Sequence, residues 1–165
     1  IPSSGNLFVN GHDVKHINLS SYRSLIGHSL LEELPFEGTI RENIKMNNPL
    51  ISDQDIDEVL EHLNLTDFVQ HQNKGLSTII GTDARHLPYT TAKKIMLARA
   101  VVTKPKFLVL KDPLVEFDDQ EIKKILNYLF DEKQPWTIIV VSRNKNWKNY
   151  CRRTVHLKDG QIVNN

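Results

Sequence analysis

The stretch that decides the fold is Leu87–Asp118, which reads LPYTTAKKIMLARAVVTKPKFLVLKDPLVEFD. Its first half predicts a helix whose apolar part runs from Ile95 to Val102. Lys104 stands before Pro105 and should end this helix, because proline pushes the residue before it out of the α region. The cationic side chains of this helix are expected to reach solvent: Lys93, Lys94 and Arg99.

A buried strand follows in the same stretch. Phe107–Leu110 is a continuous apolar run, and such a run predicts a strand that is covered on both faces. In sheets of this kind, functional groups lie just past the carboxyl end of the strand, where Lys111, Asp112 and Pro113 follow. Whether this edge carries a function therefore depends on the chemistry of these three residues.

Length and composition favour a single globular domain. The chain has 165 residues, of which 39% are hydrophobic and 25% charged, enough to bury a sizeable core. A formal net charge of +1 gives no indication of a nucleic-acid partner. Cys151 is the single cysteine, which excludes an intramolecular disulfide, and the seven histidines form no metal-ligand spacing with it, so no metal site is predicted. No apolar run approaches the length of a transmembrane helix, and no signal peptide is expected.

Local patterns predict further helices and strands. Thr39 followed by Glu42, and Ser52 followed by Asp55, are typical of helix N-termini. The helix that begins at Thr39 would turn an apolar side made of Ile40, Ile44 and Met46 toward the core. The other expected elements are a strand at 6–10, helical segments at 19–25, 52–63, 66–70 and 119–130, a second strand with both faces buried at 137–141, and a hairpin at 154–163.

Several short segments carry a family resemblance. Phe36–Ile44 reads FEGTIRENI, Leu97–Ala100 reads LARA and is followed by Lys104-Pro-Lys, and Gly5–Gly11 and Ser21–Gly27 precede them in order. This series resembles the nucleotide-binding domain of ATP-binding cassette (ABC) transporters, particularly of the exporter type. The match covers essentially the whole chain, and Phe36–Ile44 is its most specific part in the first half.

The resemblance implies a fold and a domain division. The fold would be an α/β, P-loop NTPase-like sheet with a helical subdomain, as in an ABC ATPase. Residues 1–165 would form a single nucleotide-binding-like domain, with the helical subdomain at about 37–103 and the second part of the core sheet at 104–165.

The phosphate-binding Walker A motif of the family, G-x-x-x-x-G-K-[ST], does not occur in these 165 residues. In the order of the family it would precede Ile1, so the resemblance implies a fold truncated at the N-terminus. The faces of Phe107–Leu110 and Thr137–Val141 should then be under-covered. Because open hydrophobic edges invite pairing, we expect an oligomer or an unusual strand order.

The glutamine of the family's Q-loop senses magnesium and contacts the transmembrane partner, and the resemblance places this position at Leu31. Leucine cannot coordinate a metal or orient a water molecule. Glu32 and Glu33 follow directly, either as solvated charges or as contacts to a nucleotide.

The family's signature, LSGGQ, corresponds to Leu87, Pro88, Tyr89, Thr90 and Thr91. Its serine and glycines let the backbone approach the γ-phosphate of ATP held by the opposite subunit. Pro88 lacks an N–H group, and Tyr89 adds bulk where glycine permits contact. Thr90 and Thr91 are instead predicted to cap the following helix.

At the Walker B strand, Lys111 takes the place of the magnesium-supporting aspartate and Asp112 that of the adjacent glutamate. An ammonium 4 Å from the metal would repel each unit of its charge by about 4 kcal/mol at an intermediate effective dielectric. Lys111 could instead contact phosphate directly. Asp112 either polarises water as a shorter carboxylate or forms a turn before Pro113.

Two further positions are changed or partly kept. The D-loop, S-A-L-D in the family, reads VEFD here and retains its final aspartate, Asp118. Arg143 stands at the switch-histidine position. Arginine cannot titrate near neutral pH, so it would either bind a phosphate with both arms of its guanidinium or lie on the surface without a ligand.

These observations predict a degenerate or partial ABC nucleotide-binding domain that is coupled to membrane transport and is not competent for ATP hydrolysis alone. The resemblance implies ATP and Mg²⁺ as cofactors, whereas the replaced residues argue against both. It also implies a transmembrane domain or subunit and a second nucleotide-binding domain as partners, in a homo-oligomer or heterodimer, and a cytoplasmic position at the inner face of the membrane. Two alternatives stay open: an ATPase completed by upstream residues, and a protein-interaction module that binds no nucleotide.

Overall fold

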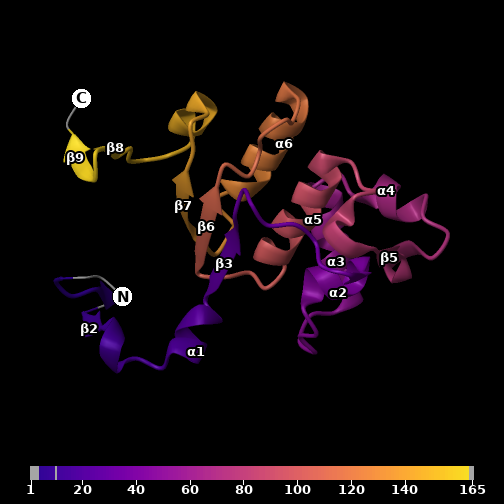
Figure 1. Cartoon of the computed structure of the whole chain (residues 1–165), viewed down its shortest axis with the longest axis horizontal. Coiled ribbons are helices and arrows are strands. Elements are labelled where there is room, and N and C mark those ends of the chain that lie inside the picture. Colours follow the sequence, from indigo (N-terminus) through magenta and orange to yellow (C-terminus); the bar gives the residue numbers. More distant parts are fainter. Residues whose placement is uncertain (1–3, 10, 164–165) are drawn as a thin grey trace.

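The computed structural model describes residues 4–9 and 11–163 and is built around a three-stranded parallel sheet. Its strand order is β3-β6-β7 (Figure 1). The register sets Leu108 of the central strand between Gly27 and Ile138. The strands are β3 (Ile26–Ser29), β6 (Phe107–Lys111) and β7 (Thr137–Val141). The α/β class is therefore as expected, and β3 is a strand that the sequence patterns did not predict.

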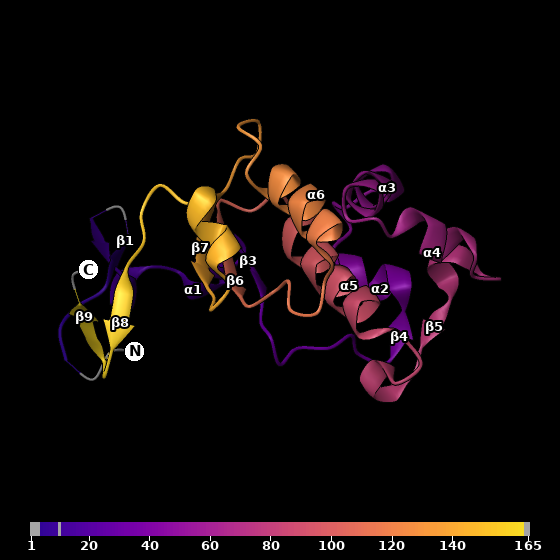
Figure 2. The same cartoon turned by 90° about the horizontal axis from the view of Figure 1, so that it is seen from above.

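One face of the sheet is covered by helices. α5 (Tyr89–Val101) and α6 (Asp119–Leu129) lie beside it (Figure 2). Leu108 and Leu110 point to this side and are fully buried. Because Gly27 has no Cβ, β3 lies directly against the last turn of α5.

The opposite face of the sheet is open. Ile139 and Val141 of β7 are 54% and 62% exposed, and Phe107 and Val109 of β6 are only partly buried. Within residues 4–9 and 11–163, no helix covers this side (Figure 2). The prediction that β6 and β7 are buried on both faces is therefore wrong for this chain, whereas the expected under-covering is confirmed. The expected oligomer stays a prediction.

A helical region lies beyond α5 at the far end from both termini (Figure 1). Both predicted capping boxes are present: Thr39 exchanges hydrogen bonds with Glu42, and Ser52 with Asp55. The expected core role of Met46 is wrong, because this residue ends its helix in the left-handed region (φ 49°) with 56% of its surface exposed. The region contains α2 (Ile40–Lys45), α3 (Asp53–His62), α4 (Thr66–Gln70) and the pair β4 (Gly38–Thr39) and β5 (Ile79–Ile80).

α5 contacts both α2 in this region and β3 in the sheet, and so joins the two parts of the molecule. The predicted boundary between a helical subdomain at 37–103 and the second part of the core sheet at 104–165 stays a prediction.

Two small hairpins lie at the end of the molecule opposite the helical region, one near each terminus (Figures 1 and 2). Asp159 and Gly160 have φ values of 50° and 77°, as a tight two-residue hairpin turn requires. Of the strand predicted at 6–10, Phe8 and Val9 are extended, and Asn10 lies outside the described residues. The elements are β1 (Phe8–Val9), β2 (His12–Asp13), α1 (Leu19–Arg23), β8 (His156–Lys158), β9 (Gln161–Val163) and the 3-10 helices η1 (Val14–His16), η2 (Gly75–Ser77), η3 (Thr82–Ala84) and η4 (Lys145–Asn149).

In the part of the chain that the structure describes, none of the helices has the length and apolar character needed to cross a membrane.

Candidate functional site

The carboxyl ends of three parallel strands meet at one edge of the sheet, and the predicted site residues gather there. The loop 30–35 follows β3, Lys111 ends β6 with Asp112 directly after it, and Ser142 and Arg143 follow β7. This edge thus brings together the Q-loop, Walker B and switch positions.

Lys111 does not face a metal site but forms an ion pair. Its ammonium donates to the Glu32 carboxylate in the loop after β3, and both side chains are open to solvent. This hydrogen bond lowers the pKa of Glu32. Glu33 makes separate contacts: one of its oxygens accepts from the Leu30 N–H at 3.0 Å and the other lies 3.2 Å from His28 Nε2. The two glutamates therefore hold the loop.

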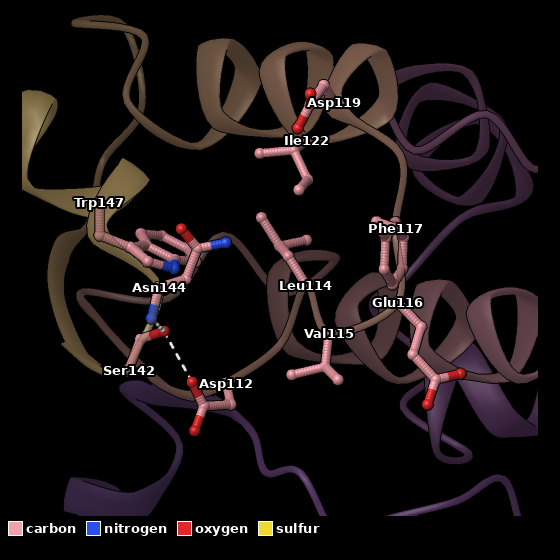
Figure 3. Close-up of a pocket in the computed structure, with 10 residues that line it drawn as sticks. All are labelled: Asp112, Leu114, Val115, Glu116, Phe117, Asp119, Ile122, Ser142, Asn144 and Trp147. Atoms are coloured by element: carbon pink, nitrogen blue, oxygen red, sulfur yellow. Dashed lines mark hydrogen bonds between the residues drawn. The ribbon is translucent and has the colours of Figure 1, made fainter.

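Asp112 joins the end of β6 to the end of β7. Its Oδ1 accepts from the Ser142 hydroxyl at 2.6 Å and from the Arg143 N–H at 3.1 Å (Figure 3). Its own N–H donates to the Val141 carbonyl at 2.9 Å. The backbone at Asp112 is left-handed (φ 41°), a conformation that Asp tolerates better than most residues. These contacts favour the turn-forming role of Asp112 over a role in polarising water.

A small cavity of about 260 Å³ opens beside Asp112. Its lining is mixed, and its polar residues include Asn144, Glu116 and Asp119. Figure 3 shows the carboxylates of Asp112, Glu116 and Asp119 pointing in different directions. Over residues 4–9 and 11–163, no three His, Cys, Asp or Glu side chains form a group that could hold a metal ion. The apolar residues of the lining include Leu114, Phe117, Ile122 and Trp147.

The signature positions form the start of α5. Pro88 is the N-cap, and no described side chain caps the helix. The prediction that Thr90 or Thr91 caps it is wrong, because the helix already begins at Tyr89 and both threonines lie in its first turn. Leu87 is half-buried against the hydrophobic core. Pro88 thus has no backbone N–H to donate, and the next residue, Tyr89, is half-buried.

Two lysines of α5 are buried, contrary to the expectation that they reach solvent. Lys93 and Lys94 are 2% and 8% exposed. The Lys93 ammonium donates to the carbonyl oxygens of Leu31 and Glu33, and that of Lys94 pairs with Glu121 of α6. Loop 30–35 and α6 flank α5 here and cover both side chains. Leu31 therefore contributes its backbone carbonyl to this edge.

The third cation of α5, Arg99, is half-buried and also does not extend freely to solvent. Its Nε donates to the Asn43 carbonyl at 2.6 Å and its Nη2 to Asn43 Oδ1 at 2.7 Å. The guanidinium lies over the Phe36 ring, 5.1 Å from its centroid. Asn43 and Phe36 both belong to the FEGTIRENI segment, so this cluster joins that segment to LARA. The sequence patterns did not predict it.

The remaining site positions have local roles. Asp118 is the N-cap of α6, and its Oδ1 accepts from the N–H groups of Gln120 and Glu121, each at 2.9 Å. Arg143 is exposed, and its backbone N–H donates to Asp112. Asp118 thus stabilises a helix start, while the guanidinium of Arg143 is accessible to a ligand or to solvent.

Comparison with known proteins agrees with this architecture. The family model described as ABC transporter matches residues 1–115. The ABC-type transporter fsqE of Aspergillus fumigatus is 32% identical over 98% of this chain, and the ATP-dependent permease MDL1 of Candida albicans is 30% identical over 98% of it. The chain spans only 13% and 24% of the lengths of these two relatives.

A solved structure has the same fold. The bacterial Atm1-family ABC exporter with ATP bound matches 91% of this chain with a TM-score of 0.82 at 21% identity, and the match covers 26% of the exporter chain. The fold is therefore that of the nucleotide-binding domain of an ABC exporter. The chain belongs to the ABC transporter family.

Proposed function

We propose that this chain is a degenerate nucleotide-binding domain that serves as a structural part of an ABC exporter and does not hydrolyse ATP with its own Walker B edge. The observation that carries the proposal is the ion pair of Lys111 with Glu32, at the position where the family supports magnesium with a carboxylate. Asp112, the one carboxylate left beside it, is engaged with Ser142 and Arg143.

Electrostatics supports the absence of metal-dependent chemistry at this edge. A carboxylate attracts a divalent cation, whereas the Lys111 ammonium repels it. At about 4 Å and an effective dielectric of about 20, the repulsion is about 4 kcal/mol for each unit of metal charge. This exceeds what a single exposed ion pair contributes, and Asp112 offers an oxygen that already accepts two hydrogen bonds.

The signature region supports the same conclusion. Pro88 cannot donate a backbone hydrogen bond to a phosphate, and Tyr89 is half-buried beside the Lys93 ammonium, 5.3 Å from the ring centroid. A second subunit would therefore receive fewer phosphate contacts from this chain than a glycine-rich signature gives. Shape and packing are retained, while the groups that contact the nucleotide are changed.

Reversing the charge at residue 111 tests the electrostatic claim. The Lys111→Asp variant of the intact protein should bind Mn²⁺, a probe for Mg²⁺, at least about tenfold more tightly in the presence of ATP, because an ammonium is replaced by a third carboxylate beside Glu32 and Asp112. Electron paramagnetic resonance of free Mn²⁺ measures this affinity.

The matched control is Lys123→Asp, which makes the same charge change at an exposed position of α6. It should leave Mn²⁺ binding unchanged within about twofold, because the Lys123 side chain is exposed to solvent, where water and salt weaken its interactions with other charges. An equal response of the two variants would show that Lys111 does not control metal binding, and would favour an ATPase site completed by other residues.

The partners follow from the family. The relatives named above are a transporter and a permease, and both are several times longer than this chain. We infer a transmembrane domain and a second nucleotide-binding domain as partners, in a homo-oligomer or heterodimer, with this chain at the cytoplasmic face of the membrane. The exposed sheet face with Ile139 and Val141 supports the expectation of a covering partner. Under the same proposal, residues 37–103 are the helical subdomain.

A further inference from the structure

The loop from Leu30 to Pro35 follows β3. A lysine of the neighbouring helix α5 binds it. Lys93 of α5 is 2% exposed, and its ammonium donates to the carbonyl oxygens of Leu31 and of Glu33, the latter at 2.6 Å. These contacts join residues 62 and 60 positions apart in the sequence. One buried cation thus binds two carbonyl groups of a surface loop, those of Leu31 and Glu33.

An ammonium is an expensive group to bury, so its position here needs a reason. Burial lowers the pKa of Lys93, and the neighbouring Glu33 and Glu32 carboxylates oppose this shift. The ammonium also lies 5.3 Å from the centroid of the Tyr89 ring. An apolar side chain of the same length would fill the space without this cost, but it would leave the two loop carbonyls without these hydrogen bonds. The lysine is therefore suited to binding the loop.

A second cation reaches the same loop from the sheet. Lys111, at the end of β6, pairs with Glu32, which lies between the two carbonyl groups that Lys93 binds. The two lysines belong to different elements and are separated from the loop by 60 residues or more. The loop can thus leave its position only by breaking contacts to both α5 and β6.

We propose that Lys93 and Lys111 form a latch that fixes the loop 30–35 in one conformation against α5 and β6. The Leu30–Glu33 hydrogen bond of 3.0 Å stiffens the loop from within, so that the latch acts on a preformed turn. The latch needs no nucleotide or metal. It shares the Lys111–Glu32 ion pair with the function proposed above, whereas its Lys93 half does not depend on that function.

The two halves of the latch differ in their response to salt. Lys111 and Glu32 are open to solvent, so salt at 1 M, where the Debye length is about 3 Å, should screen their attraction. Lys93 is shielded from solvent, and its hydrogen bonds to the loop carbonyls should persist at high salt. Lys93 is thus the principal half and Lys111 the half that salt weakens.

Amide hydrogen exchange of the intact protein, followed by mass spectrometry, tests the latch. The Lys93→Met variant keeps an unbranched side chain of similar length but loses the ammonium. We expect exchange of the Leu30 and Glu33 amides, which are hydrogen-bonded within the loop, to rise by at least about tenfold at low and at high salt, because the loop can then open locally. Lys123→Met, on the exposed side of α6, is the matched control and should leave the loop unchanged.

Glu32→Gln is the second variant, and because Glu32 is exposed it does not endanger folding. It should speed exchange of the loop by about two- to fivefold at low salt and by nothing measurable at 1 M salt. Unchanged loop exchange in either variant at low salt would overturn the latch. So would a rise in Lys93→Met that extends equally over the amides of α5, because Lys93 would then be a packing residue of the helix and not a tie to the loop.

Discussion

Replacing Asn43 with alanine is expected to lower the free energy of unfolding by about 3–5 kcal/mol, because a fully buried and fully hydrogen-bonded amide is lost. Oδ1 of Asn43 accepts from the Phe36 N–H at 2.9 Å and from Arg99 Nη2 at 2.7 Å. Nδ2 donates to the carbonyls of Phe36 and Thr39, each at 3.0 Å. Alanine would leave all of these partners without the side chain that binds them.

The Arg99 guanidinium makes the expected loss of stability in Asn43→Ala larger than it would be if all the hydrogen-bond partners of Asn43 were uncharged. Burial lowers the pKa of Arg99, but a guanidinium keeps its charge in proteins, so it must find acceptors in the folded state. With alanine at residue 43, the hydrogen bond from Arg99 Nη2 has no partner, and only the bond to the backbone carbonyl at 2.6 Å remains. A half-buried charge that loses an acceptor is among the costliest single changes.

Urea unfolding monitored by circular dichroism measures the effect as a lower midpoint at an unchanged slope. Asn73→Ala is the matched control, because Asn73 is exposed, and it should change stability by no more than about 0.5 kcal/mol. A loss below about 1 kcal/mol for Asn43→Ala would mean that the cluster does not hold FEGTIRENI against α5.

A methyl group on Gly27 is expected to destabilise the protein by about 3 kcal/mol or more, the upper part of the range for overpacked cores. A Cβ at this position would lie 2.0 Å from the Ala100 carbonyl oxygen and 2.9 Å from Pro105 Cγ. The oxygen belongs to the backbone of α5 and cannot turn away. The Gly27→Ala variant must therefore separate β3 from α5, which also weakens the pairing of β3 with β6.

Thermal unfolding followed by calorimetry compares this variant with Gly81→Ala. At Gly81 a Cβ would be 3.5 Å from the nearest His86 atom, an ordinary contact, and the backbone does not require a positive φ. Gly81→Ala should therefore change stability by no more than about 1 kcal/mol. Equal losses in the two variants would contradict the close approach of β3 to α5.

The parts of the fold that the sequence predicted are those that depend on local patterns. The Thr39 and Ser52 capping boxes involve residues three apart, so they are visible in the sequence, and both helices begin where expected. The buried stripe of α3, with Ile56, Val59 and Leu60, follows from the helical period in the same way. The family resemblance supplied the family and the fold, and the comparisons confirm both.

The parts that the sequence did not predict depend on contacts between distant residues. β3 has only four residues, among them Gly27 and His28, and it is a strand because β6 pairs with it. Lys93 looks like a solvent-exposed residue of a helix until the loop that covers it is placed. The left-handed end of α2 at Met46 likewise removes an apolar residue from the side that the period predicts.

In the candidate site, too, local patterns were predictable from the sequence and contacts between distant residues were not. The rule that function lies past the carboxyl ends of parallel strands correctly brought Lys111 and Asp112 to one edge. Whether Asp112 is a turn residue or a water-activating group depends on Ser142, 30 positions away, and no local pattern indicates that contact. The pairing of Lys111 with Glu32, 79 positions away, was equally beyond sequence reasoning.

The most direct test of the proposed function is the rate of Mg²⁺-dependent ATP hydrolysis by the intact protein with Asp112→Asn. Asparagine tolerates the left-handed backbone and offers an amide oxygen to Ser142 and Arg143, so the turn should be kept while the carboxylate is removed. We expect kcat at saturating ATP to stay within about twofold of the wild type, because Asp112 does not act on water. A loss of about 100-fold or more, the size expected for a removed general base, in a variant with unchanged thermal stability would show that Asp112 is catalytic and that the proposal is wrong.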